Sequence, residues 1–150
     1  MKKSTTILSA AALLFSASIF AADSAETSVS SKASSAFQKD FSSAKNVSWQ
    51  KKNDVYFVSF DVNNNSREAA YNEQGELVGA SRLITSAELP LAVSLAVAKK
   101  YESYTVAKIA TEITYENETN YYINVGNESQ ILRLKCSING DITVDSKTKK

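Results

Sequence analysis

Two short stretches share one pattern and constrain the fold more than any other feature. They are AAYNEQGEL at residues 69–77 and LKCSINGDI at residues 134–142, sixty-five positions later. Each has an alternating run, a polar turn, a glycine, an acidic residue and an aliphatic residue. Asn72 and Ser137 suit the first position of a type I turn, and Gly75 and Gly140 supply the positive φ that a following bulge requires. The pattern predicts one β-hairpin turn used twice, not a phosphate-binding loop, which needs a longer glycine-rich segment opening a helix.

Helical spacing precedes each of these regions. Apolar residues recur at every fourth position in two segments, which is the spacing of one helix face. They are Val29, Ala33, Phe37 and Phe41 in the first segment, and Leu89, Val93, Val97 and Tyr101 in the second. We expect the first helix to end near Ser42. Pro90 suits the first turn of the second helix, because its missing N–H would be unpaired there.

Segments rich in β-branched and aromatic residues follow each helix and read as strands. They are NVSW, DVYFVSFDV, REAAYN and ELVGASRL, then TVAKIATEITY, NYYINV, QILRLKCSI and DITVD. Each half has only about sixty residues, which is marginal for an independent core. We therefore expect the halves to join in one sheet of about eight strands. The predicted fold class is α+β, with two tandem helix-plus-four-antiparallel-strand repeats and the helices packed on one face of a concave sheet.

The N-terminus reads as a secretory signal peptide. Two lysines precede an apolar stretch from Ile7 to Phe20, and small residues follow at Ala21 and Ala22. The stretch is shorter than the roughly 20 residues that a membrane-spanning helix needs. The predicted organisation is a signal peptide at 1–21, a flexible linker at 22–30, a folded domain at 31–145 with repeats at about 31–84 and 86–145, and a tail at 146–150. The chain is therefore predicted to be periplasmic or secreted, with no stable membrane insertion after signal cleavage.

The absence of histidine limits the kinds of catalytic and metal-binding sites that the chain can form. The 150 residues include no histidine and a single cysteine, Cys136. This removes the usual general base, the Ser-His and Cys-His nucleophile pairs and the commonest zinc ligand. Without Lys2 and Lys3, the chain has 15 basic and 16 acidic residues. A net charge this close to zero does not indicate binding to nucleic acid or to an anionic membrane. We expect no enzyme activity, no cofactor, no metal and no nucleic-acid partner.

Strand alternation assigns residues to two faces of the sheet. The predicted helix-covered row comprises Tyr56, Val58, Phe60, Val62, Ala69, Tyr71, Tyr121, Ile123, Val125, Leu132, Leu134, Cys136 and Ile138. Cys136 is expected to be a buried, inert thiol rather than a reactive one, because buried cysteine behaves as a small hydrophobe. Trp49 is expected to close the first strand against the first helix.

The opposite face is expected to lack helices. It carries Phe57, Ser59, Asp61, Glu68, Ala70, Tyr122, Asn124, Ile131, Arg133 and Lys135. Phe57 and Tyr122 stand at matched positions of the two halves. Two interpretations remain open for them: they anchor a partner, or they fill cross-strand pairs or lie under a loop.

Two motifs have spacings found in chemical sites. Asp61, Asn63 and Asn65 have the alternating spacing of a calcium loop, but a serine stands where the loop needs glycine, so an Asn-rich hairpin turn is favoured. Paired carboxylates such as Glu112 and Glu116 could in principle hydrolyse glycosides. They fall in turns and exposed strand positions, so a solvated surface is favoured.

Short motifs throughout the chain carry a family resemblance. They are AFQKDF, AKNVSW, YFVSF, AAYNEQGEL, LPLAVSLAVAKKY, YYINV and LKCSINGDI. Together they resemble the PepSY-like family of exported bacterial proteins, which share a β-lactamase-inhibitor-protein-like fold, over roughly Ser31 to Asp145. The second half departs from the pattern, since its first strand lacks a tryptophan and Cys136 replaces an aromatic residue. The resemblance implies no catalytic residues for this chain. It implies helices on one face of a concave sheet, and in β-lactamase inhibitor proteins the concave face is the binding surface.

These observations predict an exported, non-enzymatic binding module. It would recognise a protein or peptide, as an inhibitor does, through the helix-free sheet face. The candidate binding residues are Phe57, Tyr122, Arg133 and Lys135. Two other functions remain open: a periplasmic small-molecule or lipid carrier with its ligand between helices and sheet, and a carboxylate hydrolase.

Overall fold

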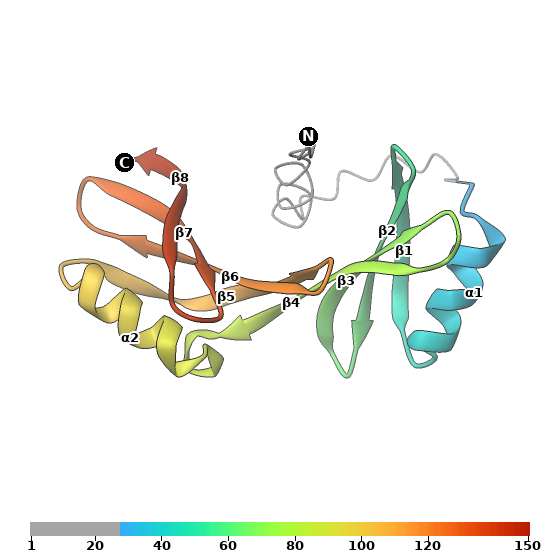
Figure 1. Cartoon of the computed structure of the whole chain (residues 1–150), viewed down its shortest axis with the longest axis horizontal. Coiled ribbons are helices and arrows are strands. Elements are labelled where there is room, and N and C mark those ends of the chain that lie inside the picture. Colours follow the sequence, from blue (N-terminus) through green and yellow to red (C-terminus); the bar gives the residue numbers. More distant parts are fainter. Residues whose placement is uncertain (1–27) are drawn as a thin grey trace, which may run out of the picture.

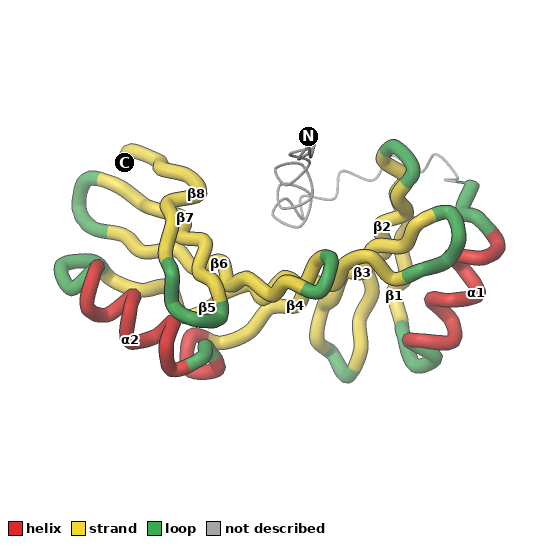
Figure 2. Tube along the Cα trace, viewed as in Figure 1, coloured by secondary structure: helices red, strands yellow, loops and turns green. Residues whose placement is uncertain are grey.

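The computed structural model describes residues 28–150, so the predicted signal peptide and most of the predicted linker lie outside the described residues. Eight strands, two α-helices and one short 3-10 helix follow one another along this part of the chain (Figures 1 and 2). Their order is α1 (Ser31–Asp40), β1 (Lys45–Lys52), β2 (Val55–Val62), β3 (Asn65–Asn72), β4 (Leu77–Thr85), η1 (Ser86–Glu88), α2 (Leu91–Lys100), β5 (Thr105–Tyr115), β6 (Glu118–Gly126), β7 (Gln130–Ser137) and β8 (Ile142–Lys149).

The strands form one antiparallel sheet in the order β1 to β8. At its centre, β4 and β5 pair continuously from Gly79 opposite Tyr115 to Thr85 opposite Ile109. The predicted class of two tandem helix-plus-four-strand repeats is therefore wrong: the fold is mostly β, a single eight-stranded sheet with two ten-residue helices. The physical reason is that β4 and β5 satisfy each other's backbone N–H and C=O groups, so the strands form one continuous unit rather than two four-stranded ones. The expectation that the halves join in one sheet of about eight strands is confirmed.

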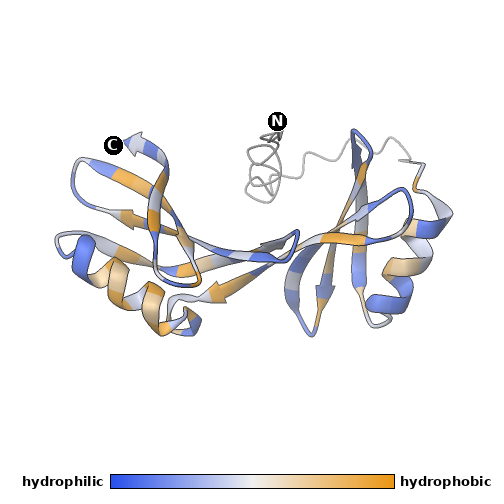
Figure 3. Ribbon diagram, in the orientation of Figure 1, coloured by the Kyte–Doolittle hydropathy of each residue, from blue (hydrophilic) through white to orange (hydrophobic). Residues whose placement is uncertain are grey.

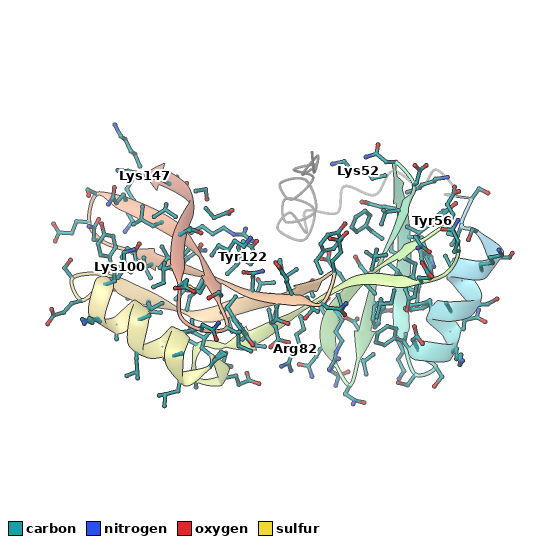
Figure 4. The ribbon with its side chains drawn as sticks, viewed as in Figure 1. Lys52, Tyr56, Arg82, Lys100, Tyr122 and Lys147 are labelled. Carbon is teal, nitrogen blue, oxygen red and sulfur yellow. The ribbon has the colours of Figure 1, made fainter. Side chains whose placement is uncertain are left out.

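One row of residues across the sheet shows how the helix-covered face is organised. The strand register places Phe60, Arg67, Arg82, Glu112, Tyr121 and Cys136 opposite one another from β2 to β7. The outer members belong to apolar cores, whereas the three central members are charged. Figure 4 shows Arg82 near the middle of the molecule, between the two helices. This face therefore carries two separate cores with a charged belt between them.

The charged belt consists of Arg67, Arg82 and Glu112, and Arg82 and Glu112 form an ion pair within it. Arg82 donates from Nε to Glu112 Oε1 at 2.7 Å and from Nη2 to Oε2 at 3.2 Å, a two-pronged arrangement typical of strong arginine–carboxylate pairs. This contact is the main cause that raises the pKa of Arg82. Arg67 stands directly opposite Arg82, and like charges in that position oppose each other. Apolar packing is thereby interrupted at the middle of the sheet.

The first core forms where α1 packs on β2 and β3. Ala33 and Phe37 are buried there, together with side chains of both strands. The ring of Phe37 lies 5.0 Å from that of Phe60 and 5.3 Å from that of Trp49, centroid to centroid, which confirms the expected packing of Trp49 against the helix. The Ser30 side chain caps α1 by accepting from the N–H of Ala33.

The second core forms where α2 packs on β5, β6 and β7. All four residues of the predicted stripe are buried, together with Ile123, Val125, Leu134 and Cys136. Pro90 is the N-cap of α2 and not part of its first turn, with ψ of 143°. Ile138 was expected in the core row and is 54% exposed. It follows the end of β7 at Ser137, so it lies in a turn where strand alternation no longer applies.

The two glycine turns have the predicted backbone conformation. Gly75 and Gly140 have φ of 82° and 90°, and their N–H groups donate to the carbonyls of Asn72 and Ser137 at 3.1 and 3.0 Å. Each turn also lies against a helix. A Cβ on Gly75 would lie 2.7 Å from the backbone oxygen of Lys32 in α1. A Cβ on Gly140 would lie equally close to the corresponding oxygen of Ala92 in α2.

We expect the fold to lose stability at alkaline pH. Burial raises the pKa of Tyr101 and of Tyr122, and it raises the pKa of Cys136 to about 11. The folded state then keeps protons that the unfolded state releases, so the free energy of unfolding falls as pH rises from about 9 to about 11. Urea titrations across this range should show the loss. Tyr122→Phe should make the pH dependence shallower, and an unchanged pH dependence in this variant would contradict the assignment for Tyr122.

Candidate functional site

The predicted site residues share the sheet face opposite the helices. Tyr122 of β6 pairs with Lys135 of β7, and Asn124 pairs with Arg133, so these four side chains project from one face. Phe57 of β2 reaches the same face through its pairing with Ala70, which in turn stands opposite Gly79. Figure 4 shows Tyr122 on the side of the sheet away from α2, facing the space between the two ends of the molecule.

A third apolar cluster occupies the centre of this face. Ala70, Ile113 and Tyr122 are buried, with exposed fractions of 5% or less, and Val55, Phe57 and Val78 pack around them. The structure thus brings Phe57 and Tyr122 into one cluster from strands that are four positions apart in the sheet. We call this group the central cluster. Tyr122 contributes mainly to its interior, whereas Phe57 is only half-buried.

Positive charge lies on the β7 side of the central cluster. The guanidinium carbon of Arg133 lies 4.9 Å from the centroid of the Tyr122 ring, a cation–π geometry. Its Nε lies 3.4 Å from Asp145 Oδ2, as an ion pair rather than a hydrogen bond. Burial and the nearby Asp145 carboxylate raise the pKa of Tyr122, while Arg133 acts in the opposite direction. Lys135 is half-buried beside them, so this side of the face presents two cations.

A carboxylate lies on β3, two residues from Ala70 of the central cluster. Glu68 accepts hydrogen bonds from Ser59 at 3.4 Å and from Ser81 at 3.2 Å, which come from the two neighbouring strands. Both serine hydroxyls therefore donate to a carboxylate and have no imidazole beside them, since the chain contains no histidine. The face has an apolar centre, a carboxylate on β3 within the strands of the central cluster, and two cations on β7, one of them paired with Asp145. This arrangement can bind a complementary surface but offers no activated nucleophile.

The calcium-loop motif and the paired carboxylates do not converge on this face. Glu112 is engaged by Arg82 on the helix-covered face, and Glu116 lies in the β5–β6 turn with φ of 48°. Asn63 lies in a hairpin turn, also with positive φ, and Asp61 accepts a hydrogen bond from Asn46. Within residues 28–150, no group of three or more His, Cys, Asp or Glu side chains is placed to hold a metal ion. Over the same residues, neither helix has the length and apolar character needed to cross a bilayer.

Cys136 lies in the second core with no measurable exposure, which confirms the predicted buried thiol. Burial raises its pKa to about 11, and only the thiolate reacts with disulfide reagents. At pH 8 we expect the folded protein to react with an aromatic disulfide reagent at least about a hundredfold more slowly than the unfolded chain. Absorbance of the released thiol measures both rates. Fast labelling without denaturant would contradict burial of this side chain.

Sequence reasoning missed several residues of the site. Ile113 is one of the three buried members of the central cluster, and its two-residue spacing from Thr111 within the predicted strand could have placed it on this face. Asp145 could not have been found this way. It reaches Arg133 next to a register shift in the β7–β8 pairing, and such irregularities leave no reliable trace in an alternating pattern.

An open hollow of about 670 Å³ lies at the β5–β8 end of the sheet. Its lining includes Asn124 and Ile131 of the helix-free face, together with Val106, Asn127 and Lys150. Its walls combine polar side chains with a few aliphatic ones. The hollow extends the helix-free face beyond Arg133 toward the C-terminus.

Comparison with known proteins identifies the fold. No protein-family model and no curated protein matches the sequence. Among solved structures, a candidate periplasmic protein from Bacteroides eggerthii matches with a TM-score of 0.68 and 18% identity, over 82% of this chain and 90% of its own. A BLIP-like protein from Bacteroides fragilis matches with a TM-score of 0.66 and 19% identity, over 85% and 90%.

A DUF2874 family protein from Bacteroides uniformis matches with a TM-score of 0.65 and 19% identity, over 79% of this chain and 88% of its own. At these identities the likeness concerns the fold, and it confirms that part of the expected resemblance. Membership of the PepSY-like family stays a prediction. The chain has the fold of BLIP-like proteins.

Proposed function

We propose that the protein is an exported, non-enzymatic binding module that recognises a protein or peptide through its helix-free sheet face. The observation that carries the proposal is the central cluster, an apolar group with Arg133 and Lys135 beside it on β7 and with Glu68 next to Ala70 on β3. An apolar centre with a polar surround is the usual composition of a protein-binding surface. The signal-peptide pattern and the structural likeness to a candidate periplasmic protein support export.

The face suits a partner with an apolar side chain next to an acidic group. Phe57 is half-buried at the edge of the central cluster and offers an aromatic surface. Arg133 is already oriented by the Tyr122 ring and by Asp145. Binding a partner carboxylate would therefore cost little further side-chain conformational entropy. Lys135 adds a second cation on the same face. Inhibitor-like binding would use these same contacts.

We favour this function over a carrier that holds a small molecule or lipid between helices and sheet. The helix residues Phe37, Val93 and Val97 are at most 4% exposed and pack directly on strand residues. A ligand there would have to displace a close-packed core, which costs several kcal/mol in comparable substitutions, about 2–5 kcal/mol per large side chain. Native mass spectrometry of freshly purified protein distinguishes the two, because a carrier retains its ligand.

The proposed function is tested by partner capture from envelope extract, followed by binding measurements with the captured partner. Phe57→Ala and Lys135→Glu change the helix-free face, and Tyr122→Phe leaves the packing of the ring in place. Lys39→Glu, on the exposed side of α1, is the matched charge control. We expect at least about tenfold weaker binding for the first two variants, since truncation of an interface anchor commonly costs 1–2 kcal/mol. Lys39→Glu should bind as the wild type does. Unchanged binding in both face variants would refute the sheet-face proposal.

A further inference from the structure

The two helices have the same length and the same pattern of exposure, but their outer faces differ in chemistry. In both, the third and seventh residues are buried and the first, fifth and eighth are exposed. In α1 these exposed positions are Ser31, Ser35 and Gln38, whereas in α2 they are Leu91, Leu95 and Ala98. Leu91 is 74% exposed and Leu95 is 61% exposed. Figure 3 shows the contrast, with α2 orange to white over most of its length and blue at its Lys99–Lys100 end.

Packing within the chain does not account for this apolar stripe. The α1 helix occupies an equivalent position on its own strands with serine and glutamine on its outer face. Polar residues are therefore compatible with the outer face of such a helix. Two largely exposed leucines lower the solubility of the protein without stabilising the second core. Exposed apolar residues arranged along one face are typical of an interaction surface.

The charges at the two ends of the stripe indicate its partner. Glu88 lies just before the N-terminus of α2, and Lys99 and Lys100 occupy its last turn. Glu88 is oriented by Thr85, whose N–H and hydroxyl donate to Oε2 at 2.7 and 2.8 Å. A second copy of α2 in antiparallel orientation would place its lysines beside Glu88, and its leucines against Leu91 and Leu95. The surface is thus complementary to itself, as a two-fold interface requires.

We propose that the outer face of α2 is a homodimer interface in which two copies of this helix pack antiparallel through Leu91 and Leu95. Ala98 permits close approach of the helices, and antiparallel packing also sets the helix dipoles favourably. The stripe spans only about 15 Å, the length of a ten-residue helix. Its area is below that of stable interfaces, so we expect a weak dimer with a dissociation constant of about 10 μM to 1 mM. An anionic membrane is a poorer partner, because Glu88 would face its surface.

Cross-linking tests the position of the interface. Leu95 lies near the middle of the stripe, so Leu95→Cys should form a disulfide-linked dimer under mild oxidation at about 100 μM protein, within the expected range of association. Ser35→Cys is the matched control at the corresponding position of α1 and should remain monomeric. The native Cys136 is buried and contributes little background. Equal yields of linked dimer from both variants would overturn the proposal.

Sedimentation equilibrium tests the energetics with no introduced thiol. Leu91→Ser/Leu95→Ser gives α2 the residues of α1, and we expect it to weaken dimerisation at least about tenfold. Leu83→Ser, another exposed leucine outside α2, should leave the dissociation constant unchanged. Lys99→Glu should weaken the dimer, and added salt should weaken the wild-type dimer. A protein that stays monomeric up to about 1 mM would refute the homodimer. So would a result in which replacing Leu91 and Leu95 abolishes co-sedimentation with phosphatidylglycerol vesicles but leaves self-association unchanged.

Discussion

Replacing Phe37 with alanine is expected to lower the free energy of unfolding by about 3–5 kcal/mol, the largest effect of any single substitution considered for this protein. Phe37 is the residue through which α1 contacts the sheet. Its ring lies within 6.4 Å of the rings of Phe41, Trp49, Phe60 and Tyr71, centroid to centroid. Alanine would leave a cavity that these rings cannot close without shifting the helix. Urea denaturation followed by Trp49 fluorescence measures the loss.

Ser35→Ala is the control for the Phe37 prediction. Ser35 lies in the same helix with its side chain exposed, so its replacement should change stability by no more than about 0.5 kcal/mol. This comparison separates loss of packing from any general sensitivity of α1. A Phe37→Ala effect below about 1 kcal/mol, in a two-state transition, would show that the aromatic contacts around α1 contribute far less than their burial indicates.

Gly140→Ala is expected to destabilise the fold by about 2–3 kcal/mol, from positive-φ strain and steric overlap together. The backbone has φ of 90°, where side chains with a Cβ are strained. The added methyl group would also lie 2.7 Å from the backbone oxygen of Ala92 in the first turn of α2. Because that atom is backbone, relief requires the turn to move away from the helix. Gly75→Ala should behave alike, since its Cβ would lie equally close to Lys32 in α1.

Gly126→Ala separates the steric effect from the general cost of changing a glycine. A Cβ at Gly126 would meet no atom closer than 3.6 Å, an ordinary contact, and this position has no positive φ. We expect Gly126→Ala to change the free energy of unfolding by less than about 1 kcal/mol. Thermal melts of the three alanine variants at one pH make the comparison. Similar melting temperatures for Gly126→Ala and Gly140→Ala would show that the turn–helix contact does not constrain the fold.

Much of the local structure could be predicted, because it depends on short-range rules. Two-residue alternation placed Phe57, Tyr122, Arg133 and Lys135 on one face. Four-residue spacing identified the fully buried stripe of the second helix and a first stripe that is buried at Ala33 and Phe37. The glycines of the two turns were recognised from the positions of their neighbours along the chain. These patterns arise from backbone geometry that each segment carries by itself.

Other features depend on which strands become neighbours. The tandem-repeat fold class was wrong because the repeated pattern suggested two equal units, whereas the eight strands pair into one sheet that dominates over two short helices. The expected core row ignored its centre, where the register brings Arg67 opposite Arg82 and Arg82 opposite Glu112. Ile138 was misplaced because a strand pattern was extended into a turn.

The sequence by itself determined the elements, the two turns, the buried thiol and, within the strands, the membership of each sheet face, since these follow from periodicities of two and four residues and from residue type. Only the tertiary structure decided that one sheet carries two cores separated by charge. It also decided that the central cluster draws on strands β2 to β6, and that the glycine turns contact the helices. The physical reason is that these features join residues distant in the chain, and strand pairing selects those neighbours through hydrogen bonds that any residue's backbone can make.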